Sequence, residues 1–312
     1  MFPRTSLTLA AAAVMALAPA VGHAATNWSF NLQATAPTST TAGDAGGYGN
    51  TRTYSASGVT VGVGAYSNTG INPDATGQVT QDNNNANRLE TAKLAYDSTW
   101  QGLGAYNRDA GGTSTSTAGT DYQEGQSPEH SFDNNERADS ALLSFGTSVN
   151  LTSITFGWWN TDSDFYVLAY TGAGTPTLTG LTYATLSGWT LVGNYSAPGG
   201  STAGGAFTTT LGTTITSSYW LVGAGGFASG VGVTNDSTST TSCTGGYDSR
   251  GKCKGWTTTT TPLYDYLKLT GIAGTTNGGT FPPAGVPEPG SLALAGAAFL
   301  GMVGLRRRKV VA

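Results

Sequence analysis

The sequence has few of the residues on which most catalytic and metal sites depend. Two histidines and two cysteines occur among 312 residues, and charged residues make up only 10%. One of the histidines, His23, falls in the apolar amino-terminal segment, so the rest of the chain keeps His130 alone. No G-x-S-x-G, H-E-x-x-H or paired-histidine pattern supports a hydrolase. We therefore predict that the protein is not an enzyme and needs no cofactor, with calcium as the one candidate ion.

Helix-forming charged residues and basic patches are also scarce. The chain has 14 Lys+Arg and 18 Asp+Glu, of which five cations and one acid lie in its two ends. The body between the ends therefore has 9 basic and 17 acidic residues, a net charge of about −8. Such an acidic body argues against nucleic acid as a partner, because phosphate binding needs clustered Lys and Arg. The sequence also has no tandem repeat, which argues against a solenoid.

Glycine, threonine and serine are abundant, and short apolar runs recur between them. Thr and aromatic residues favour strands, Gly, Asn and Ser favour turns, and no convincing helical period is present. These features predict an all-β fold, an antiparallel β-sandwich or jelly-roll-like body over residues 26–270. Its aromatic residues are expected to pack between the sheets. The expected strands are Val59–Tyr66, Ala141–Phe145, Val149–Phe156, Phe165–Tyr170, Trp189–Val192, Tyr219–Val222 and Tyr264–Leu269, the second and third joined by a hairpin-like turn.

The amino-terminal end has the three parts of a secretory signal. Arg4 precedes an apolar run from Leu7 to Val21, and small residues follow it. The run falls short of the roughly 30 Å hydrocarbon core, which favours cleavage over anchoring. We predict a signal helix over 1–25, recognised by the general secretion machinery and removed by signal peptidase near Ala24 or Ala25.

The carboxyl-terminal end combines a proline-bracketed acid, an apolar run and a basic cluster. Two prolines keep the first part extended, and the cations should stay on the cytoplasmic side of a short transmembrane helix. A Gly/Thr-rich linker is expected at 271–285, before the sorting segment at 286–309. The residues that define the segment are Val286, Pro287, Glu288, Pro289, Arg306, Arg307 and Arg308.

This carboxyl-terminal arrangement resembles the PEP-CTERM sorting signal of Gram-negative bacteria. The resemblance implies an inner-membrane-anchored precursor that an exosortase processes, and then a place at the cell surface or in the extracellular matrix. It also implies a setting of exopolysaccharide and biofilm. We expect a structural or adhesive role there, with a secreted, lectin-like carbohydrate-binding module as the alternative and a polysaccharide hydrolase as a further one.

A second resemblance covers most of the body. Its segments look like the exosortase-dependent surface protein family, which implies a secreted, β-rich protein with no established enzymatic activity and no catalytic residues to carry over. The matching segments are 102–109, 127–134, 141–145, 156–158, 161–164, 187–194, 218–223 and 264–269.

The most charged window, residues 121–139, allows three interpretations. It could supply a calcium site together with residues beyond the next strands, because calcium prefers carboxylate and carbonyl oxygens from loops. A hydrolase would use His130 as its base, or a carboxylate pair. Alternatively, Asp and Asn turns and an Arg137 ion pair simply cap a loop. The calcium ligands would be Asp133, Asn135, Asp162 and Asp164.

The two cysteines, Cys243 and Cys253, lie close together in a Gly/Thr/Ser-rich segment. Export makes a disulfide the expected state for such a pair, whereas two thiolates alone make a poor metal site. A loop this small is stabilised by roughly 2–3 kcal/mol in the chain-entropy description. The disulfide should therefore staple a local loop rather than hold the fold together.

Overall fold

The computed structural model describes residues 25–44, 47–70, 87–97, 102–108, 130–135, 137–161, 163–196 and 204–276. These residues belong to one compact unit, Ala25–Asn277. The predicted signal peptide up to residue 24, the sorting segment and its transmembrane helix lie outside the described residues. Within the ranges given above, no helix is both long and apolar enough to cross a membrane.

The described chain consists of strands, and every pairing between them is antiparallel. The predicted all-β, antiparallel fold is therefore confirmed for this part of the chain. A 3₁₀ turn, η2 (Tyr183–Thr185), interrupts the strands once in the described ranges. The strands are β1 (Thr26–Asn31), β2 (Ser39–Thr41), β3 (Thr51–Ala56), β4 (Val59–Gly70), β5 (Arg88–Asp97), β6 (Gly102–Tyr106), β7 (Phe132–Asp133), β8 (Asp139–Thr161), β9 (Asp164–Tyr170), β10 (Trp189–Ser196), β11 (Phe207–Thr210), β12 (Ser217–Ala224), β13 (Gly226–Ala228), β14 (Gly232–Thr234), β15 (Ser237–Cys243), β16 (Trp256–Pro262) and β17 (Asp265–Thr276).

The long strand β8 organises the main sheet. Its first part pairs with β4 on one side and β12 on the other, and its second part pairs with β17 and β11. The expected hairpin turn at Gly146–Ser148 was wrong, because these residues stay extended within β8. Small residues suggest a turn in isolation. Here the two halves of β8 pair with different strands, and the chain continues from one half to the other without reversing.

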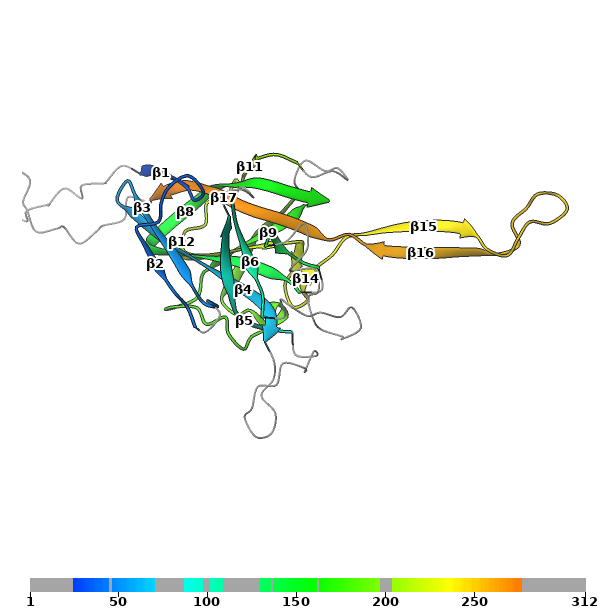
Figure 1. The fold of residues 1–312 in the computed structure, drawn as a ribbon, viewed down its shortest axis with the longest axis horizontal. Coiled ribbons are helices and arrows are strands. Elements are labelled where there is room, and N and C mark those ends of the chain that lie inside the picture. The colour runs from blue at the N-terminus through cyan, green and yellow to red at the C-terminus, as the bar shows by residue number, and fades with distance from the viewer. Residues whose placement is uncertain are drawn as a thin grey trace, which may run out of the picture. The chain divides into compact units, whose positions relative to one another are not determined.

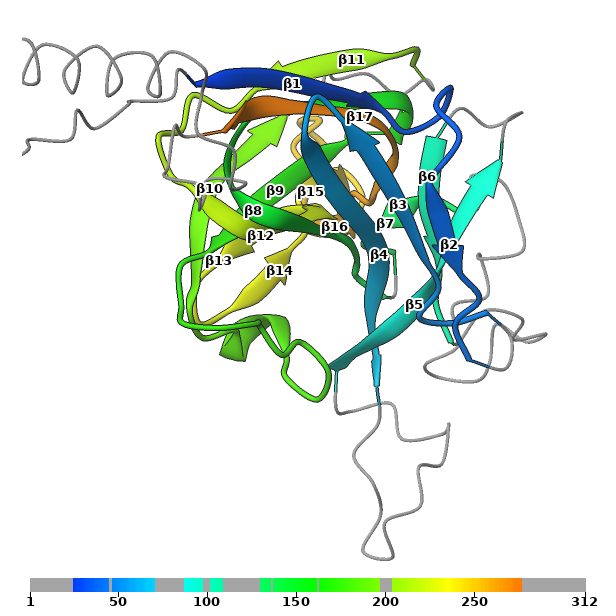
Figure 2. The ribbon, with the colours of Figure 1, turned by 90° about the vertical axis from the view of Figure 1, so that its left-hand side faces the viewer.

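The pairings close a ring of strands in the order β8, β17, β6, β5, β4 and again β8. Side chains from all five strands meet in the main hydrophobic core. In β4, Val59, Val61 and Val63 are buried whereas Thr60 is exposed, the two-residue period of a strand with one inward face. Figure 2 shows β2–β6 gathered on one side of β8, and β9, β10 and β12 on the other.

The layer formed by β8, β9 and β12 is covered on both faces. Trp220 and Phe165 point into the main core and are fully buried, as the sequence predicted for packing aromatics. On the opposite face, Tyr166 and Leu168 join a second cluster with Tyr183 and Phe227. This second cluster fixes η2 and the β13–β14 hairpin over the sheet, and the candidate site lies beside it.

The predicted linker begins too early. Residues 271–276 form the end of β17, where Gly271 pairs with Asn31 of β1 and Ile272 pairs with Ile154 of β8. Ile272 is 2% exposed, and its burial explains why a Gly/Thr-rich stretch nevertheless continues a strand. Residues 277–285 of the expected linker lie outside the described residues.

Candidate functional site

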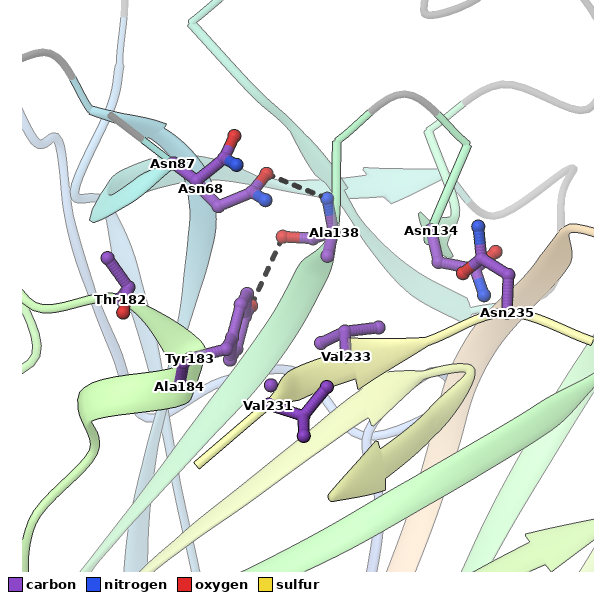
Figure 3. Close-up of a pocket in the computed structure, with 11 residues that line it drawn as sticks. Asn68, Asn87, Asn134, Ala138, Thr182, Tyr183, Ala184, Val231, Val233 and Asn235 are labelled. Carbon is purple, nitrogen blue, oxygen red and sulfur yellow. Dashed lines mark hydrogen bonds between the residues drawn. The ribbon is translucent and has the colours of Figure 1, made fainter. Parts of the chain in front are cut away.

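A cavity of about 370 Å³ opens where the end of β4, the start of β8, η2 and the β13–β14 hairpin meet (Figure 3). Its size lies within the range of small-ligand pockets, roughly 300–1,000 Å³. The described residues that line it carry no charged side chain. Amide, hydroxyl and aliphatic groups line it instead, chiefly from Asn68, Asn87, Asn134, Asn235, Thr182, Tyr183, Val231 and Val233.

Two of the asparagines are held by hydrogen bonds from their surroundings. The Oδ1 atom of Asn68 accepts from the backbone N–H of Ala138 at 2.9 Å. Asn134 donates its Nδ2 to Asp265 Oδ2 at 2.7 Å, and its Oδ1 accepts from the Asp265 backbone N–H at 2.7 Å. Gly225, with a φ of 87°, leaves the space that the Asn134 amide occupies. The cavity therefore has fixed amide groups on its wall before any ligand arrives.

At its base, the cavity is lined by the buried phenol of Tyr183, which contacts a second buried phenol, Tyr166. Tyr183 donates its hydroxyl hydrogen bond to the Ala138 carbonyl at 3.1 Å, and its Oη lies 2.9 Å from Ser140 Oγ. Tyr166 packs against it edge-on, with ring centroids 6.1 Å apart. Burial raises the pKa of both phenols well above the usual value of a tyrosine. Both therefore stay neutral in ordinary conditions, and the cavity keeps an uncharged base.

The structure brings some of the predicted calcium ligands together, around a residue that the sequence did not single out. Asp265 accepts from the Asp164 backbone N–H at 2.6 Å as well as from Asn134. Asp133 lies on the neighbouring β7 and is 7% exposed, and its Oδ1 accepts from the Asn135 backbone N–H at 3.0 Å. Carboxylates here serve as turn and strand caps, in line with the loop-capping interpretation.

The calcium site itself stays a prediction. In the part of the chain that the structure describes, no group of three His, Cys, Asp or Glu residues is placed to hold a metal. Asp162, one of the four expected ligands, lies outside the described residues.

His130 stacks on a tyrosine at β6. Its ring centroid lies 3.8 Å from that of Tyr106, and Nε2 is hydrogen bonded to the Tyr106 hydroxyl. Its backbone adopts a positive φ of 58°, and Gly104 opposite it leaves room for the His130 carbonyl. Glu129, which would accompany it in a hydrolase, lies outside the described residues, so the structure leaves the hydrolase alternative untested.

The asparagines that line the cavity could not be recognised from the sequence. Asn68, Asn134 and Asn235 are far apart in the chain. The β4–β8 and β7–β17 pairings and the position of the β13–β14 hairpin bring their neighbourhoods together. Asparagine is also a common turn residue, so none of these positions carries a chemical signature by itself.

Comparison with known proteins identifies the carboxyl-terminal segment. The described residues form an all-β body, and the sequence continues into a terminal segment of prolines, apolar residues and arginines. The family model of the PEP-CTERM protein-sorting motif matches residues 285–309, so the chain carries this sorting motif at its carboxyl-terminal end. This motif marks an exported, membrane-anchored precursor that an exosortase processes and that then reaches the surface. No curated protein and no solved structure matches the chain.

Proposed function

We propose that this protein is a structural or adhesive component of the extracellular matrix of a Gram-negative bacterium, placed there by an exosortase and without catalytic activity. The sorting motif at 285–309 carries the proposal, because it is the signal that directs the protein to its location. The strand-rich body supports it through its exposed Thr and Ser hydroxyls, which suit contact with hydrated polymers. We also infer that the body is a β-sandwich-type member of the exosortase-dependent surface proteins. The layer that is packed on both faces supports that inference.

The matrix role is tested by locating the native protein in its own host. Cells are sheared gently, and the protein is quantified in the matrix, envelope and medium fractions. We expect the mature form in the matrix fraction, together with exopolysaccharide. Recovery as free protein in the medium, with none in the matrix, would contradict the proposal.

A second function, binding of a neutral saccharide, is favoured by the amide-lined cavity. Fixed amides offer both donors and acceptors, as a sugar hydroxyl requires, and Val231 and Val233 offer an apolar surface beside them. An uncharged base and wall favour a neutral ligand over an ionic one. This would make the protein a lectin-like module, with calcium as an optional partner at the neighbouring carboxylates.

The saccharide proposal is tested by calorimetric titration of the full chain with neutral disaccharides, in calcium and in EDTA. Asn235→Ala removes one amide from the cavity, and Asn27→Ala removes an exposed amide from β1 as the matched control. Binding that the first variant weakens and the second leaves intact is expected. Equal affinities in both variants and the parent would refute the site.

A further inference from the structure

The strands β15 and β16 form a separate two-stranded ribbon that extends away from the main sheet (Figure 1). Seven residue pairs join Ser237–Cys243 to Trp256–Pro262, a length of about 23 Å at roughly 3.3 Å per residue. Nearly all of its residues are exposed, so both faces are in water. Cross-strand hydroxyl pairs such as Thr241–Thr258, 3.0 Å apart, link its strands.

The far end of the ribbon, the tip (residues 243–256), has a defined structure. The Cys243–Cys253 disulfide closes it, with the two Cα atoms 5.8 Å apart. Inside the loop, the Asp248 carboxylate accepts from the backbone N–H groups of Arg250 and Lys252, both at 2.8 Å. The one acid of the tip is therefore engaged in forming the turn.

The tip differs from the rest of the body in charge. It holds three cations, Arg250, Lys252 and Lys254, and one acid, a net charge of +2. Outside the tip, residues 26–285 keep 6 basic and 16 acidic residues, a net charge of −10. The three cations are exposed, and the two ion pairs of Arg108, with Asp44 and with Glu90, involve none of them. The tip is thus a small cationic surface on an acidic protein.

Two aromatic side chains accompany these cations. Tyr247 and Trp256 are each 64% exposed, whereas Trp220 in the core is fully buried. An exposed indole and an exposed phenol in the same tip as three cations offer apolar stacking surface together with charge. A sugar ring with a carboxylate matches both features, because its C–H face stacks on an aromatic ring and its anion pairs with Lys or Arg.

We propose that the tip binds anionic, uronate-type polysaccharide. The proposal rests on the matrix location proposed above and names the surface that makes the contact. Charge complementarity favours an anionic partner. The acidic body would repel such a partner, and the ribbon holds the tip away from the body. Three cations are too few for the dense phosphates of nucleic acid, whereas a sparsely charged, sugar-rich chain suits them. Many copies on one surface would add avidity along a polymer.

The test uses the full-length protein in detergent and measures its binding to polygalacturonate, with dextran as the uncharged control. We expect polygalacturonate binding that weakens as salt rises, because screening acts over about 8 Å at physiological ionic strength. Replacing all three cations by glutamine should reduce affinity about tenfold or more. The single change Lys252→Gln should weaken polygalacturonate binding, whereas Lys93→Gln, which removes an exposed cation from β5, should not.

Trp256→Ala should weaken binding severalfold without changing its salt dependence. Unchanged polygalacturonate binding in the triple variant would overturn the proposal. Equal affinity for duplex DNA would also overturn it, because the tip would then bind nucleic acid. The same holds if sedimentation shows self-association that the triple variant abolishes, because the partner would then be a second copy of the chain. If the protein is found in the matrix fraction but does not bind polygalacturonate, the tip proposal is refuted and the proposed matrix role is not. A protein that binds polygalacturonate but never reaches the matrix refutes the proposed function alone.

Discussion

Reduction of the Cys243–Cys253 disulfide should loosen the tip and leave the body intact. The chain has two cysteines, so a reductant changes this bond and no other disulfide. The cysteines are 10 residues apart, and a closed loop of about 11 residues corresponds to about 2.7 kcal/mol at 25 °C in the chain-entropy description. A two-stranded ribbon alone is only marginally stable, so this amount decides whether the tip stays closed.

Hydrogen exchange measures the effect directly. A loss of about 2.7 kcal/mol corresponds to about a hundredfold faster exchange for tip amides such as Lys254, which donates to the Gly246 carbonyl at 2.8 Å. Amides of β17 should exchange at the same rate before and after reduction, and the melting temperature of the body should not change. A parallel loss of protection in β17 would refute the reasoning, since it would show that the ribbon and the body unfold as one unit.

Three other perturbations test the body and the cavity. Trp220→Ala should lower the free energy of unfolding by about 3–5 kcal/mol, measured by denaturant titration, because this fully buried indole fills the main core. Asp265→Asn should cost about 1–3 kcal/mol, because an NH₂ group replaces one of the two accepting oxygens and faces either the Asn134 amide or the Asp164 backbone N–H; thermal melting of the variant checks this. Stability should fall as pH rises above about 10, because the unfolded chain ionises its tyrosines there while burial holds the pKa of Tyr166 and Tyr183 higher in the fold. Replacing both tyrosines by phenylalanine should flatten that alkaline decline.

The sequence predicted strands well where alternation was strong. Residues Val59–Tyr66 lie in β4, where a period-two pattern matches one buried face. Residues Phe165–Tyr170 lie in β9, where a continuous apolar run matches a strand that is buried on both faces. It failed at Gly146–Ser148 and at 271–276, where small residues look like turn or linker. Strands that are distant in the chain pair with the residues on either side of 146–148 and with residues 271–276, and local composition carries no record of these pairings.

The candidate site was less predictable than the fold. The calcium hypothesis grouped Asp133 and Asn135 with Asp164. It did not include Asn134 or Asp265, and Asp265, which is hydrogen bonded to both Asn134 and Asp164, lies more than a hundred residues away from them in the sequence. The cavity depends on the strand register between β4 and β8 and on the position of the β13–β14 hairpin. Neither follows from residue types alone.

The most direct test of the central claim is the processing of the full chain in a host that has an exosortase. Electrophoresis and mass measurement of the surface fraction should show a shortened mature form that lacks the arginine cluster. Changing Pro287, Glu288 and Pro289 to alanine should leave an unprocessed, membrane-held form. The same triple change with unaltered maturation and surface delivery would contradict the account.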